Sequence, residues 1–227
     1  MQGCRPFFMA APGPCVPCGL PMIIFDFDGT LIDSRHLCVT ALQKTFRDMN
    51  LPGPPKEELE KYNGPSHEET AKMLGLPTGL EAEFCKIRRG YQMALLESCQ
   101  QIYPGVKKML DILSACAGLF IASNASQEYI DKSLQHWGIG KYFVKARGGD
   151  AARTKGQLVA ELVREHCPLR AVMVGDRLID ILAGKENGLC TVAAAYGFGS
   201  PLEWQEADKQ AHSVEELTDI CLQFCGR

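Results

Sequence analysis

The chain has 227 residues, of which 46% are hydrophobic and 22% charged, so it can bury a core without disulfide bridges. Its formal net charge of −3 favours neither nucleic acid nor an anionic membrane as a partner. The eleven cysteines are odd in number and scattered through predicted core elements, which predicts free thiols in a reducing, cytoplasmic compartment.

The first 21 residues are rich in proline, glycine and cysteine and show no periodicity. We predict that 1–21 form a poorly ordered extension, because prolines interrupt its one short apolar stretch. Cys15 and Cys18 form a lone pair at metal-binding spacing, but zinc requires four ligands. No run of about 18 apolar residues occurs, which predicts that no segment spans a membrane.

The segment 22–34 predicts the beginning of an α/β core. Residues 22–27 are a short apolar run that ends on acids, typical of a strand buried between two layers. Ser34 is a candidate cap for a helix over 35–49. From 56 to about 100 the pattern is helical and interrupted by turns such as 63–65 and 75–77. We therefore predict that 35–101 form an all-helical domain inserted into a core made of 22–34 and 102–227.

Strands alternate with helices after the turn at 103–105. The expected strands are 119–123, 142–144, 171–175 and 190–194, and the expected helices are 106–115, 127–137, 155–166, 179–187 and 214–225. Such alternation predicts a Rossmann-like, doubly wound parallel sheet with helices on both faces.

Acids and small polar groups follow three of the predicted strands. Asp26 and Asp28 follow the first strand, Ser123 and Asn124 lie at the end of the second, and Asp176 follows the fourth. Ligands of open α/β sheets bind beyond the carboxyl ends of the strands, so these groups are expected to meet. The alternative is that 28–30 form only a turn, because Asp-Gly dipeptides mark turns.

A cluster of these carboxylates, joined by Asp180, would repel itself unless a cation compensated its charge. Oxygen ligands of this kind suit Mg²⁺, whose coordination a substrate phosphate completes. Lys155, at the beginning of a predicted helix, supplies a second positive charge. The composition of the cluster therefore predicts a site for Mg²⁺ and a phosphate dianion.

Asp26 and Asp28 can divide the chemistry of phosphate transfer between them. A carboxylate can attack phosphorus and form an aspartyl phosphate. A second carboxylate two residues on, on the same side of a continuing strand, can protonate the leaving oxygen and then deprotonate water. We therefore predict that Asp26 is the nucleophile and Asp28 the general acid/base.

Over about 22–226 the chain resembles the haloacid dehalogenase superfamily of phosphohydrolases. The segments 26–34, 123–124 and 175–180, together with Lys155, match its four motifs in order. The resemblance implies that Ser123, Asn124 and Lys155 bind the phosphate. It also implies Mg²⁺ ligands at Asp26, Asp28 and Asp176, with Asp180 in support. One departure is Gly156, where the family often has proline.

The helical insert resembles the cap of the phosphoglycolate phosphatase-like branch. That resemblance implies a Mg²⁺-dependent phosphatase that hydrolyses small phosphomonoesters, with a sugar phosphomutase or a non-catalytic binding protein of the same fold as alternatives. Arg88 and Arg89 in the insert are candidates to bind a second anionic group of the substrate, and a solvated helix face is the alternative. His67 is another candidate for substrate contact, with helix capping or exposure as the alternative.

Overall fold

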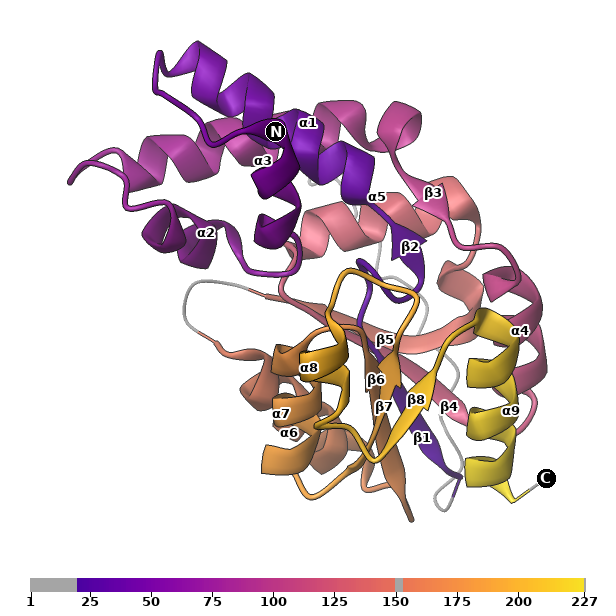
Figure 1. The fold of residues 1–227 in the computed structure, drawn as a ribbon. Coiled ribbons are helices and arrows are strands. Elements are labelled where there is room, and N and C mark those ends of the chain that lie inside the picture. Colours follow the sequence, from indigo (N-terminus) through magenta and orange to yellow (C-terminus); the bar gives the residue numbers. More distant parts are fainter. Residues whose placement is uncertain (1–19, 150–152, 227) are drawn as a thin grey trace, which may run out of the picture.

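The computed structural model describes residues 20–149 and 153–226. The Cys15 and Cys18 pair and nearly all of the predicted extension lie outside the described residues. Figure 1 shows a central sheet with helices on both faces and a further group of helices beyond one end of the sheet. The sheet has six strands in the order β5-β4-β1-β6-β7-β8, and every neighbouring pair is parallel. The predicted α/β fold is therefore confirmed.

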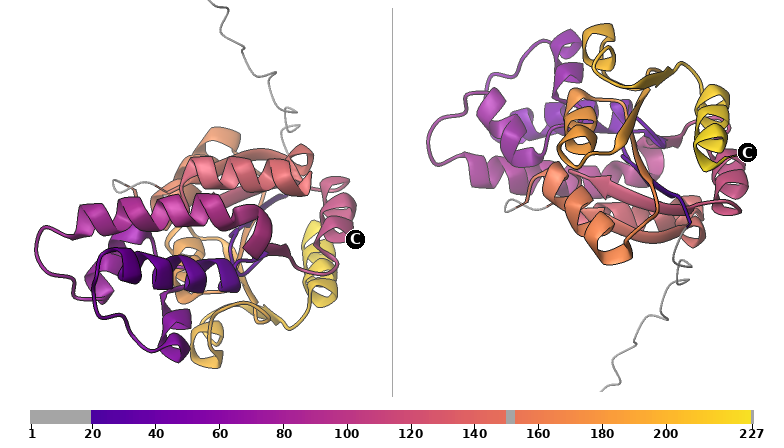
Figure 2. Two further views of the ribbon diagram at one scale, coloured as in Figure 1. Left: turned by 90° about the horizontal axis from the view of Figure 1, so that it is seen from above. Right: turned by 90° about the horizontal axis from the view of Figure 1, so that it is seen from below.

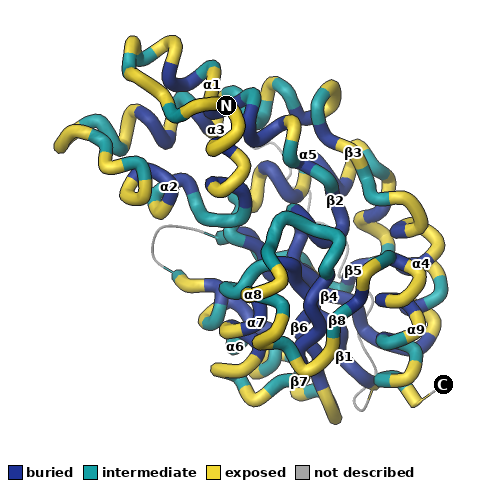
Figure 3. Tube along the Cα trace, viewed as in Figure 1, coloured by how far each residue is buried: buried dark blue, intermediate teal, exposed yellow. Residues whose placement is uncertain are grey.

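The strands of this sheet are short. They are β1 (Met22–Phe25), β4 (Gly118–Ser123), β5 (Phe143–Gly148), β6 (Ala171–Gly175), β7 (Cys190–Ala194) and β8 (Lys209–Ala211). Side chains of β1 alternate between two cores, because successive residues of a strand point to opposite faces. Ile23 and Phe25 join the larger core and Met22 and Ile24 the smaller one. The central strands β1, β4 and β6 are buried throughout, as Figure 3 shows.

In the described part of the chain, five helices cover the sheet. They are α4 (Val106–Ser114), α5 (Gln127–Trp137), α6 (Lys155–His166), α7 (Leu178–Glu186) and α9 (Val214–Cys225). Helices α4, α5 and α9 contribute to the larger core, and α6 and α7 to the smaller one on the opposite face. Connections are made by the 3-10 helix η2 (Gly140–Tyr142) and the short helix α8 (Pro201–Trp204).

The remaining helices form what we call the helical group, residues 35–99. It consists of α1 (Arg35–Asp48), η1 (Lys56–Tyr62), α2 (His67–Met73) and α3 (Glu81–Cys99). These elements share a separate hydrophobic cluster that includes Leu42, Phe46 and Phe84. Two short antiparallel strands, β2 (Ile32–Asp33) and β3 (Gln101–Ile102), stand where the chain enters and leaves the group. Figure 2 shows the group from two further sides. The division into two domains stays a prediction.

The chain departs from the predicted elements at several points. β1 ends at Phe25 rather than at 27, because the chain turns through Gly29, whose φ is +85°. Ser34 occupies the N-cap position of α1, but its side chain makes no capping bond, so that prediction was wrong. The strand predicted at 142–144 begins at Phe143 and continues to Gly148.

Two general predictions can also be compared with the structure. The described cysteines are free thiols, as expected for a reducing compartment, although the cytoplasmic location itself stays a prediction. Within 20–149 and 153–226, no helix combines the length and apolar character needed to cross a membrane.

Candidate active site

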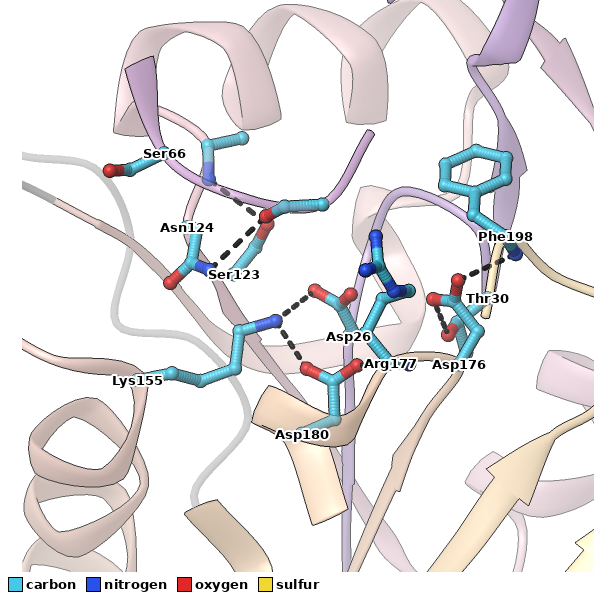
Figure 4. A network of polar contacts seen from close by, with 12 residues as sticks. Asp26, Thr30, Ser66, Ser123, Asn124, Lys155, Asp176, Arg177, Asp180 and Phe198 are labelled. Atoms are coloured by element: carbon cyan, nitrogen blue, oxygen red, sulfur yellow. Dashed lines mark hydrogen bonds and ion pairs between the residues drawn. The ribbon is translucent and has the colours of Figure 1, made fainter. Parts of the chain in front are cut away.

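The site lies at the carboxyl ends of three adjacent strands. β1 pairs with β4 on one side and with β6 on the other, so the sheet order reverses around β1. Asp26 follows β1, Ser123 ends β4 and Asp176 follows β6. All three are buried. Such a reversal point is where open α/β sheets bind their ligands, and Figure 4 shows the side chains that meet there.

Lys155 lies between two carboxylates. Its Nζ stands 2.7 Å from Asp26 Oδ1 and also donates to Asp180 Oδ1. Lys155 is the first residue of α6, whose beginning is fixed by a capping box between Thr154 and Gln157. Burial lowers the pKa of Lys155, but Asp180 and Asp26 outweigh this effect and the pKa is raised, so the ammonium stays charged.

The pKa of Asp26, the candidate nucleophile, is raised far above the usual value for an aspartate. Burial, and then repulsion from Asp180, raise the pKa of Asp26 to about 7, although Lys155 opposes this shift. Asp180 is itself held in place, because its Oδ2 accepts a hydrogen bond from the Arg177 main-chain N–H at 2.9 Å. The lysine therefore offsets only part of the negative charge around Asp26.

Asp176 is fixed by contacts from both sides of the site. Its Oδ1 accepts from Thr30 Oγ1 at 3.2 Å, and its Oδ2 accepts from the Phe198 main-chain N–H at 2.7 Å. A Cβ at Gly29 would lie 2.4 Å from Asp176 Oδ2, so only glycine allows this close approach. Burial, followed by Asp180 and Asp26, raises the pKa of Asp176 well above its usual range.

Three carboxylates in the described part of the chain could hold a cation together. Oxygen atoms of Asp26, Asp176 and Asp180 all lie within 4.8 Å of one another. Their three potential negative charges face one lysine, and the donors are oxygen only, which fits Mg²⁺ better than a softer metal. The Asp28 carboxylate is not part of this group, and its predicted role as a metal ligand stays a prediction.

Asp28 follows a bend at Phe27 and has different partners from Asp26. Its Oδ1 accepts from the Tyr129 hydroxyl at 2.8 Å. Tyr129 in turn accepts from Gln100 Nε2 at 2.8 Å, and Trp137 Nε1 donates to Gln100 Oε1 at 2.8 Å. Burial raises the pKa of Asp28, while hydrogen bonds from Ser34 and Tyr129 oppose the shift. Sequence reasoning missed Tyr129 and Gln100, because no motif connects residues that are so distant along the chain.

Asn124 contacts the helical group. Its Nδ2 donates to the Gly64 carbonyl at 3.2 Å, and Arg177 Nη1 donates to the Asn63 carbonyl. Arg177 also pairs with Glu203 at 3.1 Å. These contacts hold the loop at 63–64 against the sheet edge. The predicted phosphate-binding role of Asn124 stays a prediction, as does that of Ser123, whose Oγ accepts from the Ala125 main-chain N–H at 3.2 Å.

The two candidate arginines of the helical group have opposite environments. Arg89 lies on the surface and pairs with Glu68 at 3.5 Å. Arg88 is buried, and it lines a small cavity together with Asp26, Asp28 and Ser123. Arg88 therefore lines the cavity that contains Asp26, whereas Arg89 lines an adjoining cavity with Asn124 and Lys155.

Comparisons with known proteins agree with this geometry. The family model of haloacid dehalogenase-like hydrolases matches residues 23–194. A phosphoglycolate phosphatase of Vibrio vulnificus is 29% identical over 89% of this chain and 96% of that relative. A 5'-nucleotidase of Pseudomonas aeruginosa is 26% identical over 88% of this chain and 93% of that protein. A haloacid dehalogenase-like hydrolase of Streptococcus pneumoniae superposes with a TM-score of 0.81 at 24% identity, covering 88% of this chain and 97% of that one.

Proposed function

The chain belongs to the haloacid dehalogenase-like hydrolase family and is a phosphatase, and from this we propose that it is a Mg²⁺-dependent enzyme that hydrolyses small phosphomonoesters through an aspartyl phosphate on Asp26. The observation that carries the proposal is the position of Asp26. It is buried at the reversal point of the sheet, paired with Lys155, and lines one cavity with Asp28 and Ser123.

The proposed reaction proceeds in two steps. A carboxylate oxygen of Asp26 attacks phosphorus, the bond from phosphorus to the ester oxygen breaks, and Asp28 gives its proton to the departing alcohol. Asp28 then accepts a proton from water, which attacks the aspartyl phosphate and releases inorganic phosphate and free Asp26. The raised pKa of Asp28 favours its protonated form at the beginning of this cycle.

Charge on the phosphoryl oxygens needs stabilisation in both steps. Lys155, whose Nζ pairs with Asp26, and Ser123, which lines the same cavity as Asp26, are proposed to bind these oxygens. Asp26, Asp176 and Asp180 are the side chains that would hold Mg²⁺. Bound Mg²⁺ would supply further positive charge to the phosphoryl group.

The helical group is proposed to act as a cap over this site. Its loop at 63–64 meets Asn124 and Arg177 of the core, and its α3 contributes Arg88 to the cavity that contains Asp26. A cap that closes in this way excludes bulk water from the first step and must open to release products. The names of the relatives support a small phosphorylated substrate such as phosphoglycolate or a nucleotide.

Hydrolysis of p-nitrophenyl phosphate with and without Mg²⁺ tests the proposal. We expect turnover only with Mg²⁺, and we expect Asp26→Asn to abolish it because an amide does not attack phosphorus. The melting temperature of this variant should equal or exceed that of wild type, because a repelled buried charge is removed. The matched control is Asp111→Asn, on the exposed face of α4. Turnover by Asp26→Asn at the wild-type rate would refute the role of Asp26.

A further inference from the structure

Arg88 is a buried cation whose guanidinium makes few polar contacts. Its side chain lies on α3 and is 2% exposed. Nη2 donates to the Tyr62 carbonyl at 3.4 Å, whereas Nε and Nη1 have no hydrogen-bond partner. No carboxylate in the described part of the chain forms an ion pair with it. Burial of a charge without a partner is costly, so such a group indicates a partner that arrives from outside the chain.

The position of Arg88 indicates the chemical class of that partner. The guanidinium lines the same cavity as Asp26, Asp28 and Ser123, where the phosphoryl group of a substrate is proposed to bind. Its neighbour Asp28 is already held by the Tyr129 hydroxyl, which donates to Asp28 Oδ1 at 2.8 Å. A planar guanidinium with two free donor nitrogens matches a carboxylate or a phosphate.

His67 stands in the same cavity and adds a second donor or acceptor. It is buried, and its Nδ1 has no partner. Burial, together with the charges of Arg88 and Arg89, lowers the pKa of His67 well below its usual value, so the imidazole is neutral. A neutral imidazole can donate one hydrogen bond to an anion without adding to the positive charge.

We propose that Arg88, with His67 beside it, binds a second anionic group of the substrate, so that the substrate class is a small phosphomonoester that also carries a carboxylate or a second phosphate. This inference rests on the proposed phosphatase function. A competing role is that Arg88 acts through Asp28, whose pKa it helps to lower. The two roles differ in what they predict for an ester without a second charge.

The test compares esters of similar size in wild type and in Arg88→Met. 2-Phosphoglycolate carries a carboxylate, ethane-1,2-diyl bisphosphate a second phosphate, and ethyl phosphate neither. We expect kcat/KM of wild type to be at least about tenfold higher for one of the charged esters than for ethyl phosphate. Arg88→Met should lose this preference, with a much smaller loss of rate on ethyl phosphate than on the charged esters. Arg89→Met, which removes the exposed neighbour, should retain the preference.

Stability supplies a second readout. Methionine fills a similar volume without charge, so Arg88→Met should melt at or above the wild-type temperature if the guanidinium serves the ligand. A lower melting temperature would assign Arg88 a structural role and overturn the proposal. Arg88→Lys keeps the charge and is expected to retain part of the preference for charged esters. If its preference is no greater than that of Arg88→Met, the proposed binding of a second anionic group at Arg88, the anion site, is refuted.

The failures of the two proposals are distinguishable. If wild type hydrolyses the three esters equally, the anion site is refuted while the phosphatase function stands. If Arg88→Met slows all three equally, Arg88 acts through Asp28 and the anion site is again refuted. If wild type hydrolyses none of them, nor p-nitrophenyl phosphate, the function itself fails and the anion site with it.

Discussion

Asp26 and Asp28 are two residues apart, but their carboxylates have different neighbours. Asp26 pairs with Lys155, whereas Asp28 accepts from the Tyr129 hydroxyl at 2.8 Å. β1 ends before Asp26 and the chain bends at Phe27 between them, so the geometry of a continuing strand does not apply. Tyr129 is in turn fixed by Gln100, which donates to it at 2.8 Å and to Ser133 at 3.0 Å. Tyr129 is therefore a positioning residue for the proposed acid/base.

Removal of one hydroxyl tests this role. Tyr129→Phe should lower kcat by about tenfold, since a hydrogen bond to a charged group contributes about 1.5–3 kcal/mol and part of it is replaced by water. KM should change little, because Tyr129 does not line the cavity that contains Asp26. The measurement is steady-state kinetics with p-nitrophenyl phosphate. Tyr142→Phe, which removes an exposed hydroxyl near Asp111, is the matched control. An unchanged kcat in Tyr129→Phe would contradict the positioning role.

The sequence predicted where some of the candidate residues lie and missed others for a physical reason. Asp26, Ser123 and Asp176 stand directly at strand ends, so the topology of a parallel sheet brings them together. Tyr129 and Gln100 were not predicted, because their positions depend on how α5 packs beside the chain leaving the helical group. A choice between Arg88 and Arg89 was equally impossible, because adjacent helix positions differ only in which one faces the core.

At the scale of elements, α3 contains a residue that weakens it. Gly90 lies in the interior of this 19-residue helix, is exposed, and an added Cβ there would meet no atom within 4 Å. Glycine in a helix interior is less favourable than alanine, because its unfolded backbone has more freedom to lose. The helix therefore tolerates this glycine at a cost in stability.

Gly90→Ala should raise the free energy of unfolding by about 0.5–1 kcal/mol. Urea titration should show a higher midpoint with an unchanged m-value. Gly64→Ala is the contrasting variant, because Gly64 has φ +101° and its Cβ would lie 3.1 Å from Arg177. That variant should be less stable than wild type. A destabilised Gly90→Ala would show that α3 makes contacts at this position that the structure lacks.

The accuracy of the predicted elements depended on how clear their apolar pattern was. Helices α5, α6 and α9 have the predicted bounds, because each is long enough for a clear hydrophobic period. Strands β6 and β7 also have the predicted bounds, because each is a short, almost continuously buried run. The strands β2, β3 and β8 have two or three residues each and were not predicted. Elements this short are defined by the strand they pair with, which local sequence does not specify.

Across the whole molecule, negative charge concentrates where the sheet order reverses. Asp26, Asp176 and Asp180 converge there from two loops and a helix, and Figure 4 shows Lys155 paired with Asp26 and Asp180. Repulsion within this cluster opposes folding of the metal-free protein, because the carboxylates are separated in the unfolded chain. Because the cation binds only the folded protein, its binding should raise the free energy of unfolding of the whole molecule.

Thermal unfolding with EDTA or Mg²⁺ measures this coupling without any substrate. At about one hundred times its Kd, Mg²⁺ should stabilise the fold by about 2.7 kcal/mol, which corresponds to a rise in Tm of about 5–10 °C. The effect should depend on pH. The folded-state pKa of Asp26 is raised from 3.8 to about 7, so its contribution to stability is present below pH 4 and is lost as the pH rises to 7.

The rise in Tm caused by Mg²⁺ should therefore be larger at pH 8 than at pH 5, where protons already neutralise part of the cluster. Asp176→Asn removes one ligand and one repelling charge, so it should raise the Tm in EDTA and reduce the Mg²⁺ effect. A Mg²⁺ effect that is absent at pH 8, or larger at pH 5, would show that these carboxylates do not hold the metal.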